Sequence, residues 1–465
     1  MLVSHIQLAN RFRWVYCQLE NLRHCLPPSV RSTLDELPES LDGTYERVLR
    51  EIKKPNRGHA LRLLQCLVVA IRPLRVEELA EVLAVDFKDA EGMPELNTSW
   101  RWEDQEQALL SSCSSLISIV DDGDDGDDRD HRDHDSRAVQ FSHFSVKEFL
   151  TAPRLATPNR DVSIYQIVLQ HGHTIMAHAC LSVLLRSDDQ VIRTDVRNNS
   201  PLAGYAAEHW ATHAQFKNVS SYLRRAMEYL FDVDKPYFAA WKKLYDINSY
   251  LYESTFYQFA PMPSSILSRA GPLYYAALCG FQDLAEHLIV KYPQEVNAYG
   301  GYYATPFVAA LAGKHFELAR LLHRHGSSVD PRGHVRRTPL HSAAFYGDLE
   351  MIQALLEYKP DINAQNDDGK TPLSEAVRQG RHEAVRLLCE YGADPNIPGY
   401  DGEALLHLAS ETGDSKVVRL LLDHGADVGA VDEWGKTAFQ LALAKGHDEI
   451  VTLLSARGTD GSSSR

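Results

Sequence analysis

The sequence predicts a mainly α protein in which a solenoid of repeated helix pairs follows a helical region with a small α/β element. Two observations predict the solenoid. A threonine recurs at intervals of 33, 33 and 66 residues, and a glycine follows nine residues after each of four positions in this register. The threonines are Thr305, Thr338, Thr371 and Thr437, with Ala404 in the vacant position, and the glycines are Gly347, Gly380, Gly413 and Gly446. A fixed period of 20–50 residues is typical of repeat architectures.

Each period has the residues that a short helical hairpin needs. A Thr-Pro pair opens a helix, because proline at the first helical position sacrifices no hydrogen bond. The recurring glycine ends that helix in the left-handed conformation, and an apolar second helix follows. A turn such as residues 366–369, Asn-Asp-Asp-Gly, leads to the next period. A single unit cannot bury its apolar side, so we expect the units to stack.

These motifs resemble the ankyrin repeat. Residues 338–343 read TPLHSA, and residues 392–396 and 425–428 read GADPN and GADV. The resemblance implies six repeats over residues 266–457 and a disordered tail over 458–465. The repeats begin near Gly271, Ala304, Arg337, Lys370, Glu403 and Lys436. The first three depart from the pattern, since the first is one residue longer, Lys314 replaces a glycine and Lys359-Pro360 replaces Gly-Ala. We expect those three to be distorted or less stable.

The first half is predicted to be helical around a small β element. Helical patterns cover residues 41–52, 57–71 and 75–83, and β-like runs cover 116–120 and 138–143. This order is typical of a winged-helix module. We therefore predict a winged-helix-like domain over residues 57–155, whose acidic loop over 121–137 is disordered because like charges repel. A helical linker domain is predicted over 156–265.

The same half resembles the region that follows the nucleotide-binding domain in fungal NACHT–ankyrin proteins, which are related to NOD-like receptors. The resemblance depends on residues 12–19 (FRWVYCQL), 34–47 (LDELPESLDGTYER), 141–150 (FSHFSVKEFL), 200–210 (SPLAGYAAEHW) and 234–241 (DKPYFAAW). It implies that residues 1–56 are the helical remnant following a NACHT domain. The family's phosphate-binding domain belongs before Phe12, where this sequence has only eleven residues. A fragment and a naturally truncated relative both fit this difference.

Composition argues against several functions. The formal net charge is −15, and between residues 121 and 135 nine Asp stand against two Arg. This balance disfavours binding to nucleic acid, which needs clustered basic residues. Seven cysteines are scattered without a C-x-x-C pair, which predicts reduced thiols in a cytoplasmic protein and no metal site. No apolar run reaches the length of a membrane span.

Motifs that could carry chemistry have simpler explanations. The two Gly-Lys-Thr triplets at 369–371 and 435–437 lack the earlier glycine of a phosphate loop and fall in repeat turns. The Asp run has glycines among the early ligand positions of a calcium loop and lacks its glutamate. The pairs His171/His173 and His209/His213 have helical or local spacing but no evident further ligand. We predict no enzyme activity and no cofactor.

The leading hypothesis is therefore a protein–protein interaction scaffold that uses the concave surface of the repeats. We expect the inner helices to present Phe345, Tyr346, Glu375, Arg378, Gln379, Glu411 and Thr412, and the turn tips to present Asn366, Asp368, Tyr400, Asp401, Glu433 and Trp434. Aromatic and arginine side chains are the preferred anchors of interfaces. The alternative explanation is that Tyr346 or Trp434 only shields a neighbouring repeat. The resemblance implies a second function, the regulatory half of a nucleotide-switched receptor. Neither the partner nor the oligomeric state follows from the sequence.

Overall fold

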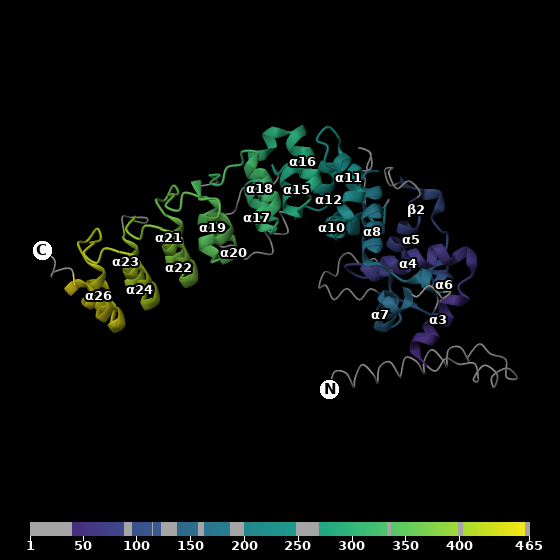
Figure 1. Ribbon diagram of the computed structural model, residues 1–465, viewed down its shortest axis with the longest axis horizontal. Coiled ribbons are helices and arrows are strands. Elements are labelled where there is room, and N and C mark those ends of the chain that lie inside the picture. The colour runs from purple at the N-terminus through teal and green to yellow at the C-terminus, as the bar shows by residue number, and fades with distance from the viewer. Residues whose placement is uncertain are drawn as a thin grey trace, which may run out of the picture. The chain divides into compact units, whose positions relative to one another are not determined.

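A computed structural model describes residues 40–87, 95–113, 115–121, 137–156, 162–186, 200–247, 269–332, 336–398 and 403–460. The chain divides into two compact units, one ending at Asp246 and the other beginning at Ile247. Each unit is described separately below, and Figure 1 labels their elements.

The first unit begins with helices around a small sheet. Its first elements are α3 (Leu41–Glu51), η2 (Lys54–Asn56), α4 (Arg57–Val69), β1 (Leu74–Arg75), α5 (Val76–Leu83), β2 (Val85–Asp86), β3 (Glu95–Leu96), η3 (Thr98–Trp100) and α6 (Gln105–Cys113). They are followed by β4 (Ile117–Asp121), β5 (Arg137–Phe141), α7 (Phe144–Thr151), η4 (Pro153–Ala156) and η5 (Ser163–Tyr165). Strands β1, β5 and β4 form one antiparallel sheet in that order, and β2 pairs with β3.

This arrangement agrees with the predicted winged helix. The sequence located the β4–β5 hairpin, with Ile119 opposite Val139 in the register. It missed α6, whose first residues are polar, and β1, which has only two residues and pairs with distant Ala138 and Val139. Asp121 and Arg137, the two ends of the predicted acidic loop, belong to the strands. Residues 122–136 and 1–39 lie outside the described part, so the predictions on them stay predictions.

Four further helices complete the described part of the first unit. They are α8 (Leu169–Leu184), α10 (Ala203–Ala214), α11 (Val219–Leu230) and α12 (Tyr237–Leu244). Helix α8 packs against α4, α10 and α11. The buried carboxylate of Glu81 in α5 accepts hydrogen bonds from the Leu202 N–H at 2.8 Å and from Ser200 Oγ at 3.0 Å. The predicted winged-helix and linker segments therefore share one core.

The described part of the second unit contains six helix pairs in succession (Figure 1). The inner helices are α15 (Pro272–Cys279), α17 (Pro306–Ala312), α19 (Pro339–Tyr346), α21 (Pro372–Arg378), α23 (Leu405–Thr412) and α25 (Ala438–Lys445). The outer helices are α16 (Gln282–Lys291), α18 (Phe316–Arg324), α20 (Leu349–Leu356), α22 (His382–Glu390), α24 (Ser415–Asp423) and α26 (Asp448–Asp460), and η6 (Pro293–Asn297) follows α16. Each unit predicted from the 33-residue period is one helix pair, and α26 extends beyond the predicted end at residue 457.

The irregular repeats keep the backbone of the regular ones. Gly347, Gly380, Gly413 and Gly446 have positive φ after the inner helices, and Lys314 takes φ 61° in the same register. After the outer helices, Lys359 takes φ 53° where Gly326, Gly392 and Gly425 have φ between 85° and 91°. Two lysines therefore accept the left-handed conformation that the repeat demands, at a cost of about 1–2 kcal/mol each.

Candidate functional site

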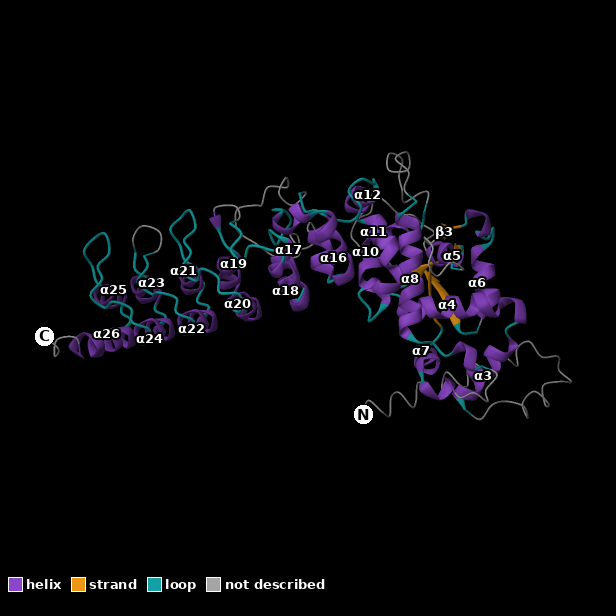
Figure 2. Cartoon of the chain, turned by 45° about the horizontal axis from the view of Figure 1, so that its top comes forward, coloured by secondary structure: helices purple, strands orange, loops and turns teal. Residues whose placement is uncertain are grey.

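The candidate site is the surface formed by the turns between repeats and the exposed side of the inner helices, which we call the finger face. In Figure 2 the loops before α21 and α25 extend to one side of the helices. In two of the described turns, one side chain accepts hydrogen bonds from the backbone of the turn. Asp432 Oδ1 accepts from the N–H groups of Trp434 at 2.9 Å and Lys436 at 2.7 Å. Asn366 Oδ1 accepts from residues 368 and 370 in the same way, at 3.0 and 2.9 Å.

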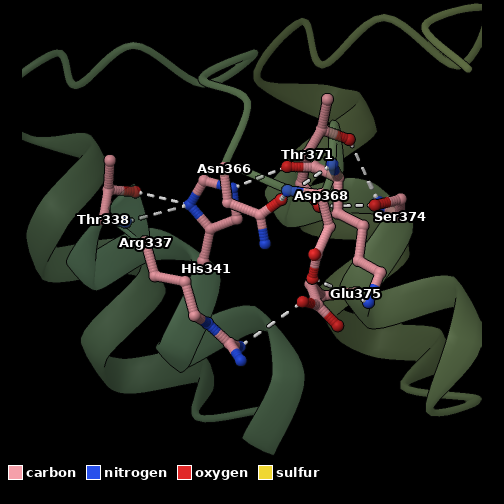
Figure 3. Close-up of polar contacts among 9 residues, drawn as sticks. Arg337, Thr338, His341, Asn366, Asp368, Thr371, Ser374 and Glu375 are labelled. Carbon is pink, nitrogen blue, oxygen red and sulfur yellow. Dashed lines mark hydrogen bonds and ion pairs between the residues drawn. The ribbon is translucent and has the colours of Figure 1, made fainter. Parts of the chain in front are cut away.

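A buried histidine holds each of two turns to the repeat before it, and we call this contact the histidine staple. His341 Nδ1 accepts from the Thr338 N–H at 3.2 Å and lies 2.8 Å from Thr338 Oγ1 (Figure 3). Its Nε2–H therefore donates to the Lys370 carbonyl at 2.9 Å, in the next repeat. His407 makes the same bond to the Lys436 carbonyl at 3.0 Å. Both histidines therefore bond to the turn of the next repeat.

Burial favours the neutral form of this histidine. His341 is fully buried, and burial lowers the pKa of its imidazole to about 4. The nearby guanidinium groups of Arg337 and Arg332 lower it further. The neutral ring is the form that the staple needs, since Nδ1 must accept while Nε2 donates. The histidine is structural.

A second contact, the asparagine staple, joins the outer sides of successive repeats. Asn396 Oδ1 accepts from the Asp427 N–H at 2.8 Å, and its Nδ2 donates to the Gly425 carbonyl at 3.0 Å. Asn297 makes the corresponding bonds to Ser328 and Gly326, at 2.7 and 2.9 Å. These contacts fix the spacing of the repeats and thus of the turns on the finger face.

Two residues that we expected on the exposed side of the inner helices, Phe345 and Glu375, are buried in the structure. Phe345 is 7% exposed, and the Arg337 guanidinium lies 5.6 Å from its ring centroid. Glu375 is 2% exposed and forms an ion pair with Arg337 at 3.5 Å (Figure 3). The helical register gave the correct side of the helix, but Arg337 of the preceding turn covers both positions.

Other predicted residues do reach the surface. Arg378, Glu411 and Trp434 are exposed, and Trp434 is 74% exposed. Glu411 pairs with Lys445 of the next inner helix at 3.0 Å. Thr412 and Glu433 are also exposed, whereas Tyr346, Gln379 and Asp368 are half-buried. Asn366 is buried within its turn, which corrects its placement at an accessible tip. Tyr400 and Asp401 lie outside the described residues.

Sequence reasoning missed apolar and aromatic residues on the same face. Val431, 57% exposed, lies in the turn that carries Trp434. Tyr302 and Tyr303 are half-buried in the turn between the first two repeats, with ring centroids 4.9 Å apart. The Tyr303 N–H donates to Tyr274 Oη at 3.1 Å, which ties this turn to the first repeat. The signal that could have found them is the Gly-rich, tyrosine-rich composition of residues 299–303.

The side chains that suggested other chemistry have structural partners. His173 Nδ1 lies 2.9 Å from His213 Nδ1, and His213 Nε2 lies 2.9 Å from Tyr205 Oη. Burial, with the neighbouring histidines, lowers the pKa of His213 to about 3. No group of three or more potential metal ligands occurs among the described residues. Over the same residues, no helix has the length and apolar character of a membrane span.

The cysteines of the described segments are buried, and none of them forms a disulfide. They are Cys66, Cys113, Cys180, Cys279 and Cys389. Burial raises the pKa of each thiol, for Cys66 to about 12, so the reactive thiolate is suppressed. The thiols are buried at these five positions, and that they are reduced stays a prediction.

Comparison with known families decides what the second unit is. The model for ankyrin repeats matches residues 273–366, 307–399 and 396–464. The second unit is an ankyrin-repeat domain. In front of it, the family model described as "GPI inositol-deacylase, winged helix domain" matches residues 45–159. The fold class predicted from the sequence, an ankyrin solenoid preceded by a winged-helix element, is confirmed.

Individual relatives cover parts of the chain. The azaphilone pigments biosynthesis cluster protein L of Monascus ruber is 26% identical over 336 residues, which is 69% of this chain and 67% of the relative. An ankyrin repeat domain from Acinetobacter baumannii AYE is 28% identical with a TM-score of 0.36, covering 40% of this chain and 97% of that one. The ankyrin repeat domain of Bcl-3 is 30% identical with a TM-score of 0.37, covering 40% and 86%.

Proposed function

We propose that this chain is a non-catalytic scaffold that binds a protein partner through its finger face. The observation that supports this function best is Trp434, which stands 74% exposed at a turn whose backbone is fixed by Asp432. A large aromatic side chain held open on a rigid turn loses little entropy on binding, which is why such residues anchor interfaces. The alternative explanation, that Trp434 only shields a neighbouring repeat, does not fit an indole that is 74% exposed to solvent.

The polar surroundings of Trp434 supply specificity. Arg378 and Glu411 are exposed on the inner helices of earlier repeats, and Glu403 lies half-buried between them in sequence. Burial raises the pKa of the Glu403 carboxyl, and the nearby Glu411 carboxylate raises it further. A cationic group of the partner would interact favourably with the carboxylates of both Glu403 and Glu411. We therefore propose an interface with an aromatic anchor and a charged rim.

Affinity capture tests the proposal with matched sets of variants. The finger-face set is Tyr346→Ala, Arg378→Ala and Trp434→Ala in one chain. The control set is Arg386→Ala and Tyr391→Ala, which removes an exposed arginine from the outer helix α22 and a 58% exposed tyrosine from its C-cap. We expect specific partners of the natural chain to be lost with the finger-face set and kept with the control. Partners that survive the finger-face set, with circular dichroism unchanged, would disprove this surface.

Nucleic acid is not the partner we propose for the winged helix. Helix α6 precedes the hairpin, the position from which winged helices commonly read DNA. Its sequence, QEQALLSSC, contains no Lys or Arg, and Glu106 forms an ion pair with Arg137 of the hairpin at 2.6 Å. The phosphate backbone requires cationic contacts that this helix does not offer. The buried free thiols suit a reducing compartment, and we place the scaffold in the cytoplasm.

The regulatory-half alternative stays a prediction from the resemblance to NACHT–ankyrin proteins. It requires a nucleotide-binding domain beyond this chain, to which the first unit would transmit binding at the repeats. The discriminating measurement is ATP binding by the purified chain, followed by the same measurement on any longer natural form. The scaffold proposal gives this chain no nucleotide site, since its two Gly-Lys-Thr triplets are repeat turns. ATP binding by this chain alone would therefore contradict the proposal.

A further inference from the structure

Among the described residues, the junction between the second and third repeats has neither a histidine staple nor a complete asparagine staple, whereas each of the other four junctions has at least one of the two. The histidine staples join the third repeat to the fourth and the fifth to the sixth. In the second repeat the same register is occupied by Val308, which is buried and has no polar atom to offer. The first junction replaces the staple with the bond from the Tyr303 N–H to Tyr274 Oη.

The asparagine staple is also incomplete at this junction, because Asp330 occupies its register. Asp330 Oδ2 accepts from the Asp361 N–H at 2.8 Å, as an asparagine oxygen would. Its Oδ1 is buried and has no hydrogen-bond partner, whereas Asn297 and Asn396 donate from this position to a carbonyl. Burial raises the pKa of the Asp330 carboxyl, as expected for an uncompensated group. Leaving a buried polar atom unsatisfied costs about 1–3 kcal/mol.

Packing shows the same discontinuity. Helices α15 and α17, α19 and α21, α21 and α23, and α23 and α25 pack as neighbouring pairs, but α17 and α19 do not pack side by side in this way. Helix α17 instead touches α20. Tyr358, from the third repeat, lies edge-on to Phe307 and His323 of the second, at 5.0 and 5.1 Å between centroids. These aromatic contacts tolerate small changes of angle better than a paired hydrogen bond does.

One ion pair crosses the junction on the outside. Lys314 Nζ lies 2.7 Å from Glu350 Oε2, and both side chains are more than half exposed. An exposed pair of this kind contributes about 0–1 kcal/mol. It does not replace the missing staples.

We propose that this junction is a hinge at which the first two repeats, α15 to α18, separate from the last four, α19 to α26. Stability in a repeat protein is close to a sum of repeat and interface contributions, so the weakest interface opens first. Three residues that take positive φ without being glycine, Lys314, Arg336 and Lys359, lie on either side of it. The hinge divides the finger face into two blocks whose relative angle a partner can select. It stands whether or not the finger face binds a protein.

Thiol labelling of the full-length chain tests the hinge. Val308→Cys places a sulfur at the proposed hinge, and Ser374→Cys places one in the same register between the fourth and fifth repeats. Both positions are buried and both changes nearly conserve volume. Labelling is followed by peptide mass spectrometry under native conditions, so that other cysteines do not interfere. We expect the Val308→Cys thiol to react at least about fivefold faster, since 1 kcal/mol of interface stability corresponds to roughly that factor.

A second change separates the hinge from local packing effects. Asp330→Asn supplies the missing donor, so in the Val308→Cys background we expect labelling to slow by about fivefold. The matched control is Asn363→Asp, which removes the amide from the same register at the next junction and should leave labelling of the Val308→Cys thiol unchanged. Equal or slower labelling at position 308 than at position 374 would overturn the hinge. So would an unchanged rate after Asp330→Asn.

Discussion

Replacing Ala404 by threonine should restore a hydrogen bond that the fifth repeat lacks. In the third repeat Thr338 Oγ1 lies 2.8 Å from His341 Nδ1. In the fifth, Ala404 has the same extended backbone, φ −69° and ψ 146°, and His407 Nδ1 is buried without a partner. Its Nε2 still donates to the Lys436 carbonyl, so Nδ1 is the acceptor in both repeats. A threonine hydroxyl at 404 would therefore meet a vacant acceptor.

The expected gain follows from two measured kinds of change. A threonine in place of alanine at a helix N-cap is worth about 0.5–2 kcal/mol, and satisfying a buried polar atom recovers part of about 1–3 kcal/mol. The two contributions overlap in a single hydroxyl, so we expect about 1–2 kcal/mol in total. Ala404 is only half-buried, so the larger side chain has room.

Hydrogen exchange of the full-length chain measures this gain where it arises. Amides of α23 and α25 should exchange about 5–30-fold more slowly in Ala404→Thr, while those of α15 should not change. The control is Ala404→Val, which has the shape of threonine without the hydroxyl. If Ala404→Val slows exchange as much as Ala404→Thr, burial rather than the hydrogen bond explains the effect. If neither slows exchange, the histidine staple does not depend on its Nδ1 partner.

Two other predictions test the repeat geometry. Lys359→Gly should raise the stability of the ankyrin domain by about 0.5–1 kcal/mol, because glycine takes positive φ without strain, and urea unfolding should show no gain for Lys359→Ala. The free energy of unfolding should fall as the pH drops from 6.5 towards 4, because His341 is protonated in the unfolded chain but stays neutral in the folded one. One such group lowers the free energy of unfolding by about 1.4 kcal/mol per pH unit in this range. His341→Gln should flatten that slope, since Gln440 already fills the same register by accepting from the Thr437 N–H at 3.0 Å; an unchanged slope would assign the acid sensitivity to other groups.

Structural features that recur with the repeat period, or that depend on residues close together in the sequence, could be predicted from the sequence. The 33-residue register located all six helix pairs of the described part. It did not allow prediction of side chains that a neighbouring repeat covers. Arg337 shields Phe345 and Glu375 because its guanidinium reaches over the inner helices, and no periodicity encodes that reach. The short strand β1 was missed for the same reason, since its pairing with β5 spans a long stretch of sequence.

Buried hydrogen bonds within the first unit lead to a last prediction about which of its fragments can fold. Glu81 is 1% exposed and accepts hydrogen bonds from Arg101, Ser200 and the Leu202 N–H. Two of the three partners of this buried winged-helix carboxylate therefore lie beyond position 155. The Ile71 N–H likewise donates to Tyr205 Oη at 3.1 Å. A fragment of residues 40–159 would keep the Arg101 partner of Glu81 but lose Ser200, Leu202 and Tyr205, and it would expose the face of α4 that packs on α8. We therefore expect it not to unfold cooperatively, whereas a fragment of residues 40–246 should do so. A sharp urea transition of the shorter fragment would show that the winged helix is an independent module and that Glu81 only fastens it to the helices that follow.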